Sequence, residues 1–216
     1  TGIELKSIYI EDKLNTIIDD NSIKGTGRVS FASLYSGITY SSALQKTVPL
    51  PKTSAGIFIS YNKGVFGSQF DFTKTGIEIR QSLLENFLPK SHLTISLRAE
   101  KIFGNFPFYE SAMLGGSEYL RGYALNRFSG DALVAAKADL DIYLFNTMIF
   151  LPADISLLLL SDAGRVFLNG ETNSKMHYSL GGGFNLGYFK RLFNMQFYGA
   201  GSEEGAKFYI SALFSF

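Results

Sequence analysis

Apolar and polar residues alternate with a period of two along most of this chain. In the segment 132–145, ALVAAKADLDIYLF, the even positions are apolar and the odd positions include Lys137, Asp139 and Asp141. A helix would spread those charges around its surface, whereas a strand places them on one side. The same alternation recurs at 76–80, 93–100, 180–188 and 206–216. The pattern predicts an all-β fold.

Ten segments carry this pattern or are bounded by turn residues typical of strands. They lie at 3–12, 28–42, 55–67, 70–85, 92–104, 131–145, 154–168, 177–189, 194–202 and 206–216. Several reach or exceed the ~9–11 residues that cross a bilayer as a tilted strand, whereas globular strands typically have ~5–6. Short connections alternate with longer polar ones, as in outer-membrane barrels. We therefore expect an antiparallel transmembrane β-barrel.

The direction of the apolar face decides between two kinds of all-β protein. In a soluble sandwich the apolar face points into a core, and in a transmembrane barrel it points to lipid. Strand length favours the barrel, as do the charges and glycines on the opposite face. Aromatic residues also gather at the expected strand ends, which suits a membrane interface. These residues are Phe66, Phe70, Phe103, Phe145, Phe150, Tyr188, Phe189 and Phe193.

Composition narrows the classes of function. Aromatic residues make up 15% of the 216 residues and charged residues only 18%, against about 25% charged in a usual soluble domain. The net charge of +1 gives no reason to expect a nucleic-acid partner. The chain has no Cys, and His92 and His177 are far apart and lack a metal-ligand spacing. No apolar run approaches the ~18 residues of a membrane helix, and no signal peptide is visible.

Other candidate sites are better explained by strand structure. Gly181–Gly183 superficially match a dinucleotide loop, but they lie inside a strand with no following helix. Glycines there are expected to permit bending or close packing. Glu78 with Arg80 and Arg98 with Glu100 are expected to be charge pairs on the polar face. No G-x-S-x-G elbow is present. We expect no catalytic activity, no metal and no cofactor.

One long segment, residues 105–130, separates two well-alternating strands. Structureless connections beyond ~12–15 residues are uncommon and are usually functional or disordered. This segment is rich in aromatic and aliphatic residues, which favour a surface to pack on. Its glycines Gly115, Gly116 and Gly122 permit a tight backbone path. We expect a loop that folds inward against the polar face of the strands.

The segment PFYESAMLGGSEYLRGY, residues 107–123, resembles the signature of the BamA-like outer-membrane assembly and translocation superfamily, the bacterial surface antigen family. Downstream, LLLLSDAGRVF resembles the Asp-x-Gly strand of that family. The approach to the loop and the terminal Phe216 are also similar. The resemblance covers residue 55 to the end. It implies that residues 1–216 are the C-terminal portion of a sixteen-stranded barrel, with about six strands missing on the N-terminal side.

The resemblance also implies a set of site residues. The loop motif is Leu120, Arg121, Gly122 and Tyr123, and its partners on the inner wall are Asp162, Gly164, Asp139 and Asp141. We expect Arg121 to pair with Asp162, assisted by Asp139 or Asp141, because a guanidinium fork matches a carboxylate with two hydrogen bonds. Most loop arginines are instead exposed. The family often has Glu-x-Arg where this chain has Asp139-Leu140-Asp141, so the network is expected to differ in detail.

The resemblance implies a protein that assists the insertion or translocation of proteins at the bacterial outer membrane. Its partners would be outer-membrane lipid and client proteins or other subunits of a complex. The last strand, with Phe208, Ile210, Phe214 and Phe216, would form one side of a seam and carry the C-terminal signal. Alternatives are a barrel that anchors an N-terminal domain such as a patatin-like lipase, a two-partner secretion pore, and a soluble lipid-carrying sandwich. Ten strands could also close by themselves or be completed by a second chain.

Overall fold

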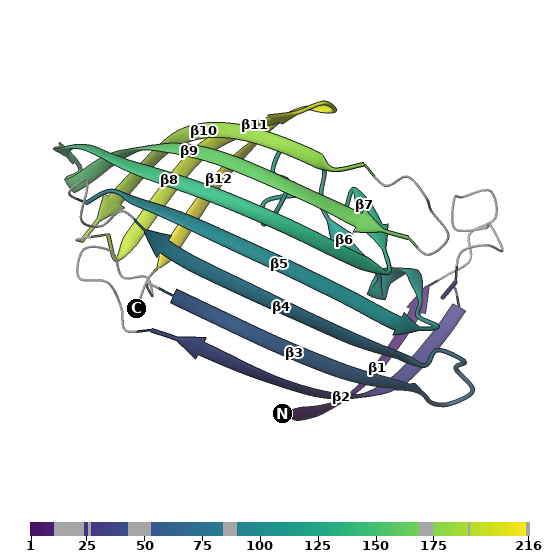
Figure 1. Ribbon diagram of the computed structural model, residues 1–216. Coiled ribbons are helices and arrows are strands. Elements are labelled where there is room, and N and C mark those ends of the chain that lie inside the picture. The colour runs from purple at the N-terminus through teal and green to yellow at the C-terminus, as the bar shows by residue number, and fades with distance from the viewer. Residues whose placement is uncertain are drawn as a thin grey trace.

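The computed structural model describes residues 1–10, 24–25, 27–42, 53–83, 90–168, 175–189 and 191–214. Ten strands form one antiparallel sheet in the order β1-β2-β3-β4-β5-β8-β9-β10-β11-β12 (Figure 1). The strands are β1 (Gly2–Ile10), β2 (Gly27–Ser41), β3 (Thr53–Gly64), β4 (Phe72–Leu83), β5 (His92–Gly104), β8 (Ala132–Ile149), β9 (Leu151–Phe167), β10 (His177–Tyr188), β11 (Phe193–Ser202) and β12 (Gly205–Phe214). Each of the ten predicted strands is present, so the all-β prediction is confirmed.

The largest error in the predicted boundaries lies between β8 and β9. The sequence predicted strands at 131–145 and 154–168, but β8 continues to Ile149 and β9 begins at Leu151. Phe150 alone reverses the chain, with a left-handed φ of 60°. A register shift between Tyr143 and Phe145 interrupts the alternation in β8, and this made the strand end difficult to recognise.

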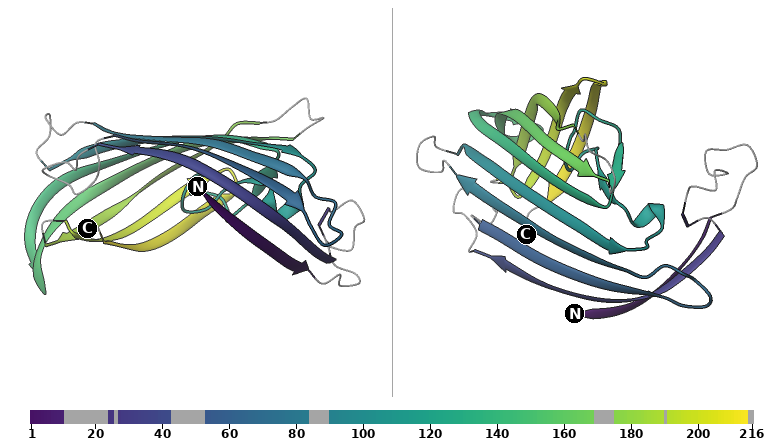
Figure 2. Two further views of the ribbon diagram at one scale, coloured as in Figure 1. Left: turned by 90° about the horizontal axis from the view of Figure 1, so that it is seen from below. Right: turned by 45° about the vertical axis from the view of Figure 1, so that its right-hand side comes forward.

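The sheet is strongly curved, and the long loop between β5 and β8 lies on its concave side (Figure 2). Strands β1 and β12 form the two edges and are not paired with each other. The sheet of the described residues is therefore open. We call the end where β5 ends and β8 begins the loop end, and the other the opposite end.

The two faces of the sheet differ in character, as the alternation predicted. The convex face carries exposed apolar side chains, among them Ile57 at 63%, Leu97 at 49% and Phe184 at 54% exposure. The concave face carries charged groups that are buried, such as Glu100 and Asp162. This is the reverse of a soluble sheet, in which the apolar face is covered and the polar face is in water.

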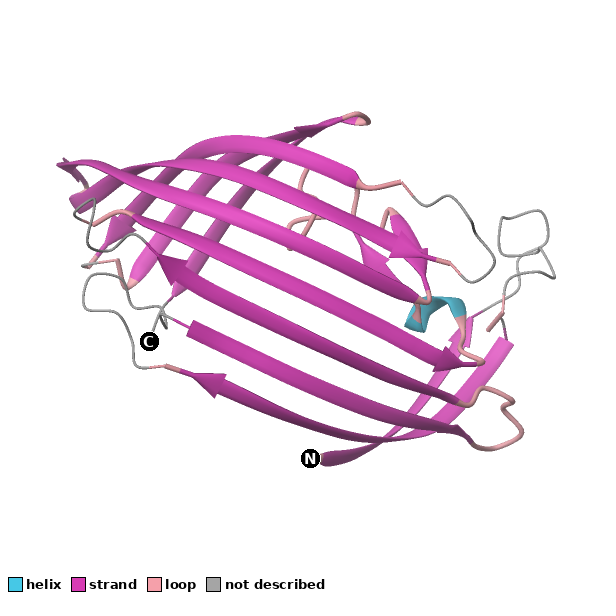
Figure 3. Ribbon diagram, viewed as in Figure 1, coloured by secondary structure: helices cyan, strands magenta, loops and turns pink. Residues whose placement is uncertain are grey.

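The hydrophobic core lies between the long loop and the concave face. The loop is ordered by a short 3-10 helix, Phe108–Glu110, and by a two-stranded sheet of β6 (Ala112–Leu114) and β7 (Phe128–Gly130) (Figure 3). The core residues are Val29, Phe31, Phe72, Ile102, Ala112, Leu114, Tyr119, Leu120, Tyr123, Leu133 and Ala135. The loop packs on the sheet as predicted, although it has more regular structure than expected.

The convex aromatic side chains lie mostly where the sequence placed them. Phe103 is exposed at the loop end, and Phe145, Phe150 and Phe189 are exposed at the opposite end. Phe70 is an exception, because it packs against the hydrophobic core. Its position in the β3–β4 connection allows it to turn inward, which alternation alone did not predict.

Candidate functional site

A tight turn presents the Arg121 motif to the concave face. The β6–β7 pairing brings the two arms of the loop together, and Gly115 has a φ of 121°. A Cβ on Gly115 would lie 2.4 Å from the carbonyl oxygen of Ala124, so only glycine fits there. Leu120 is left-handed, and its carbonyl accepts a 3.0 Å hydrogen bond from the Tyr123 amide. This turn directs the side chain of Arg121 to the sheet.

Arg121 binds Asp162 of β9 through three hydrogen bonds. The Arg121 amide donates to Asp162 Oδ2 at 2.8 Å, its Nε donates to the same oxygen at 3.0 Å, and its Nη2 donates to Oδ1 at 2.5 Å. Ser179 of β10 adds a hydroxyl donor to Oδ2 at 2.9 Å. The side chains of Arg121 and Asp162 are only 3% and 2% exposed. The predicted pair is therefore confirmed, as a buried bidentate ion pair.

Asp139 of β8 is the second carboxylate at Arg121. Its Oδ1 lies 2.6 Å from Arg121 Nη2 but without hydrogen-bond alignment, so the contact is mainly electrostatic. Its Oδ2 lies 3.3 Å from Lys137 Nζ. Burial lowers the pKa of Arg121, but the hydrogen bond to Asp162 and the charges of Asp139 and Asp162 more than offset this, so its pKa lies above the usual value. Arg121 is therefore permanently charged.

The alternative partner Asp141 belongs to a different cluster. Its carboxylate accepts hydrogen bonds from Asn185 at 2.9 Å and from Arg191 at 3.3 Å. Arg191 also donates to Ser156, and it is only 2% exposed. Assigning Asp141 to the loop motif was wrong, because the strand continues away from the loop and brings Asp141 toward the β10–β11 turn. Arg191 was missed because it precedes a strand in a left-handed turn, where sequence alone suggests exposure.

The motif also contacts the last two strands of the sheet. Tyr209 of β12 donates its hydroxyl to the Arg121 carbonyl at 2.6 Å, and Ser202 of β11 donates to the Gly122 carbonyl at 2.9 Å. A Cβ on Gly122 would lie 2.8 Å from the backbone of Gly201. Side-chain bonds to β9 and carbonyl bonds to β11 and β12 thus make the motif a brace across this part of the sheet.

The remaining motif residues anchor the loop by packing. Leu120 is fully buried and Tyr123 is 1% exposed. Tyr123 packs edge-on against Phe128, and His177 of β10 stacks on Phe128 with ring centroids 3.9 Å apart. No motif surrounds His177 in the sequence, so its packing role could not be predicted.

Gly164 of β9 lies beneath the loop. A Cβ at this position would lie 2.7 Å from Leu114 Cδ2, so glycine permits the close approach of β6 to the sheet. This agrees with its predicted place among the docking partners. The glycines of β10 act similarly, since a Cβ on Gly181 or Gly183 would meet the carbonyl oxygens of β11 within 2.4 Å.

The predicted residues of the last strand lie on the convex side of the edge strand β12. Phe208, Ile210 and Phe214 are 86%, 76% and 65% exposed. Phe216 lies outside the described residues. The structure therefore places the three described residues apart from the Arg121 motif, although Tyr209 on the other face of the same strand contacts it.

A further charged cluster lines the concave wall beside the loop. Glu100 is almost fully buried and lies 3.0 Å from both Lys74 and Arg98. Glu78 lies 3.6 Å from Arg80 of its own strand, and it is also the cross-strand partner of Arg98. These residues form the charge pairs expected of the polar face. Over the described ranges, no group of three His, Cys, Asp or Glu side chains could hold a metal ion.

The docked loop acts as a structural brace, because buried, paired charges and backbone hydrogen bonds hold it in one position.

Among the described elements, no helix has both the length and the apolar character needed to span a membrane. The sequence matches no known protein-family profile and no curated protein.

Proposed function

We propose that this chain is the C-terminal portion of an outer-membrane β-barrel of the BamA-like surface-antigen superfamily. In this proposal its ten strands are part of a sixteen-stranded wall. The protein assists the insertion or translocation of other proteins at the bacterial outer membrane, and its partners are outer-membrane lipid and client proteins.

The observation that carries the proposal is the docking of Arg121 on Asp162. The side chain of Arg121 is 3% exposed, and one carboxylate accepts three hydrogen bonds from this residue. Burying a charged pair has a high desolvation cost, so its presence here indicates a specific role. The pair joins the two sequence motifs on which the family resemblance depends.

Two features of the sheet support a membrane setting. Its convex face exposes apolar side chains along most strands, which in water would favour aggregation and in lipid is stable. Its edges among the described residues, β1 and β12, have unpaired backbone groups, which in lipid would be satisfied by pairing with further strands. An edge strand of this kind also suits the templating of a client strand by β-augmentation.

The proposal is tested with the full-length gene product reconstituted in lipid vesicles. An unfolded outer-membrane barrel protein is added, and its folding is followed by heat-modifiable gel mobility. We expect faster folding than in empty vesicles, and we expect Arg121→Gln to remove most of the acceleration. Arg127→Gln is the matched control, because Arg127 lies in the same loop but its side chain is 51% exposed, and its ion-pair partner among the described residues is Glu204 of the β11–β12 turn.

If wild-type protein does not accelerate client folding, the assembly function is rejected. If Arg127→Gln is as harmful as Arg121→Gln, the docked pair does not carry the activity. The anchor or exit-channel alternative predicts normal membrane integration with no effect on an added client, so the same assay separates it from the main proposal.

A further inference from the structure

The strands carry charge of one sign on the convex face, and at one end only; one of these charges, Lys63, is paired with Asp71 of the β3–β4 connection. Within the described strands, the charged side chains on this face are Arg28, Lys63, Lys101 and Arg165. All lie near the loop end, and all are basic. Their orientation follows from the alternation, since each is an odd number of residues from a neighbour on the concave face, such as Glu100 or Asp162. The concave face, in contrast, carries both signs.

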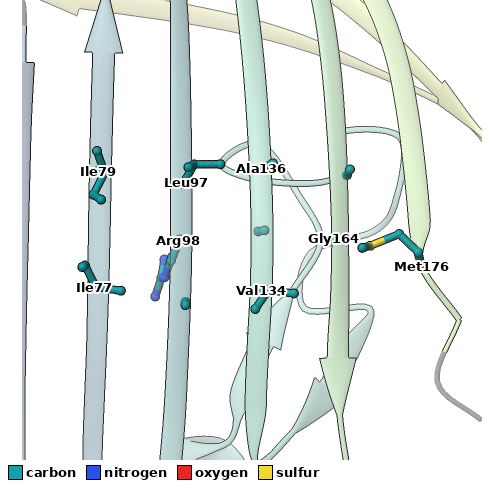
Figure 4. A pocket seen from close by; sticks show the side chains of 11 residues that line it. Ile77, Ile79, Leu97, Arg98, Val134, Ala136, Gly164 and Met176 are labelled. Atoms are coloured by element: carbon teal, nitrogen blue, oxygen red, sulfur yellow. The ribbon is translucent and has the colours of Figure 1, made fainter.

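An apolar hollow lies on the same convex face, over β4, β5, β8 and β9 (Figure 4). It has a volume of about 380 Å³. The small residues Ala99, Ala136 and Ala163 line its middle, and the larger Ile77, Leu97 and Met176 stand around them. Arg98 also lines it, but the Arg98 guanidinium bonds to Glu100 of the concave face. The hollow is therefore apolar throughout its exposed surface.

Two of the four basic residues border the loop end of this hollow. Lys101 lies two residues beyond Ala99 on β5, and Arg165 lies two residues beyond Ala163 on β9. Residues two apart in a strand share a face, so both side chains continue the surface of the hollow. Between them runs β8, where Ala132 pairs with Lys101 and Val134 pairs with Arg165.

The two basic groups differ in how fully they are paired. Lys101 Nζ lies 2.8 Å from Asp131, which partly neutralises it. The Arg165 guanidinium lies over the Phe167 ring at 4.4 Å, and its Nε is buried without a hydrogen-bond partner among the described residues. Arg165 has no ion-pair partner among the described residues, and it therefore supplies the net positive charge of the site. A guanidinium offers two parallel donors that match a phosphate.

We propose that this site binds an anionic phospholipid, with one acyl chain in the hollow and its phosphate bound to Arg165 and Lys101. The proposal rests on the membrane placement given above. Acyl chains fit an apolar depression, and anionic headgroups attract basic groups near the membrane surface. At the opposite end the convex face is aromatic but uncharged within the described residues, so a preference for anionic lipid is expected only at the loop end.

The test uses tryptophan reporters placed in this chain, which contains no Trp of its own; any tryptophan in the rest of the full-length protein is first replaced by phenylalanine. Phe103→Trp reports beside Lys101, and Phe184→Trp reports on β10; both phenylalanines face the convex side and are 54% exposed. Each full-length variant is reconstituted in vesicles that contain brominated lipids with either anionic or neutral headgroups. We expect anionic bromolipid to quench Phe103→Trp preferentially. Each basic group that contacts the lipid should raise the affinity for anionic relative to neutral lipid about fivefold. Phe184→Trp should show no preference.

Substitutions in the Phe103→Trp background separate the two parts of the site. Arg165→Gln should lower the anionic preference about fivefold. Arg28→Gln removes an equal charge from the same end but away from the hollow. This substitution should leave the preference for anionic lipid unchanged. Ala136→Leu should weaken the binding of the lipid without changing the charge. Higher ionic strength should reduce the preference, because exposed charges are screened.

Equal quenching of both reporters by both lipids would overturn the lipid site while leaving the membrane placement intact. Equal effects of Arg28→Gln and Arg165→Gln would mean diffuse attraction rather than a site, and would also overturn it. If no brominated lipid quenches either reporter, the convex face is not in a bilayer, and the proposed function fails together with the site. This last outcome would favour a protein partner on the convex face.

Discussion

Replacing Asp162 with asparagine tests the docked loop most directly. The carboxylate accepts three hydrogen bonds from Arg121 and one from Ser179, and it is 2% exposed. Asparagine has the same shape but no charge, and its amide nitrogen cannot accept a hydrogen bond. Removing one partner of a buried ion pair typically costs about 3–5 kcal/mol. Because Asp139 still lies beside Arg121, we expect Asp162→Asn to cost about 3 kcal/mol.

Amide hydrogen exchange at Arg121 measures this cost locally. The Arg121 amide itself donates to Asp162, so its exchange reports the opening of the loop rather than global unfolding. A loss of about 3 kcal/mol corresponds to exchange that is about 150-fold faster. Asp139→Asn is the control, since Asp139 is 27% exposed and lacks hydrogen-bond alignment with Arg121. Asp139→Asn should lower the free energy of loop opening by about 1 kcal/mol or less.

If Asp162→Asn accelerates exchange at Arg121 no more than Asp139→Asn does, Asp162 does not hold the loop in place. A double variant, Arg121→Met with Asp162→Leu, gives a second check. Replacing both members of a buried pair by apolar residues often restores stability, so the double variant should be more stable than Asp162→Asn. If the two changes are simply additive, Arg121 and Asp162 are not coupled.

Three further predictions concern the surroundings of the motif. Gly122→Ala should destabilise the protein by about 1–3 kcal/mol in urea unfolding, because its Cβ would lie 2.8 Å from the Gly201 backbone. Gly201→Ala, with no atom within 4 Å of its Cβ, should change stability by less than about 0.5 kcal/mol; equal effects would contradict the close approach. Tyr209→Phe removes the hydrogen bond to the Arg121 carbonyl and should make amide exchange in β12 about fivefold faster, while exchange in β2 stays constant. Burial, with the charge of Glu78, raises the pKa of Tyr119 to about 12. Its contribution to stability is therefore complete below about pH 10 and is lost as the pH rises toward 12. In an ultraviolet titration, the wild-type protein should form one more phenolate than Tyr119→Phe, and this difference should appear at about pH 12. A difference between the two proteins that appears already at pH 10 would contradict this prediction.

The sequence was sufficient for the existence of the strands, for the Arg98–Glu100 pair and, through the family resemblance, for the Arg121–Asp162 pair. Arg121 and Asp162 could be paired in advance because each belongs to a recognisable motif. The Arg191–Asp141 pair could not, since Arg191 lies in the left-handed turn between β10 and β11 and Asp141 had a second plausible partner in Arg121. Which of the two β8 aspartates, Asp139 or Asp141, reaches Arg121 depends on how far along the strand each lies, and this is a property of register.

What the sequence determined was local: a period of two fixes which residues share a face of a strand, and glycine positions fix where the loop can turn tightly. Apart from the Arg121–Asp162 pair, the tertiary structure decided the contacts that join distant segments. It placed Tyr209 and Ser202 on the carbonyls of the Arg121 motif, stacked His177 on Phe128, and brought Lys101 and Arg165 to the end of one hollow. These contacts depend on strand register and on the curvature of the sheet. Both are collective results of pairing across ten strands, which no short stretch of sequence contains.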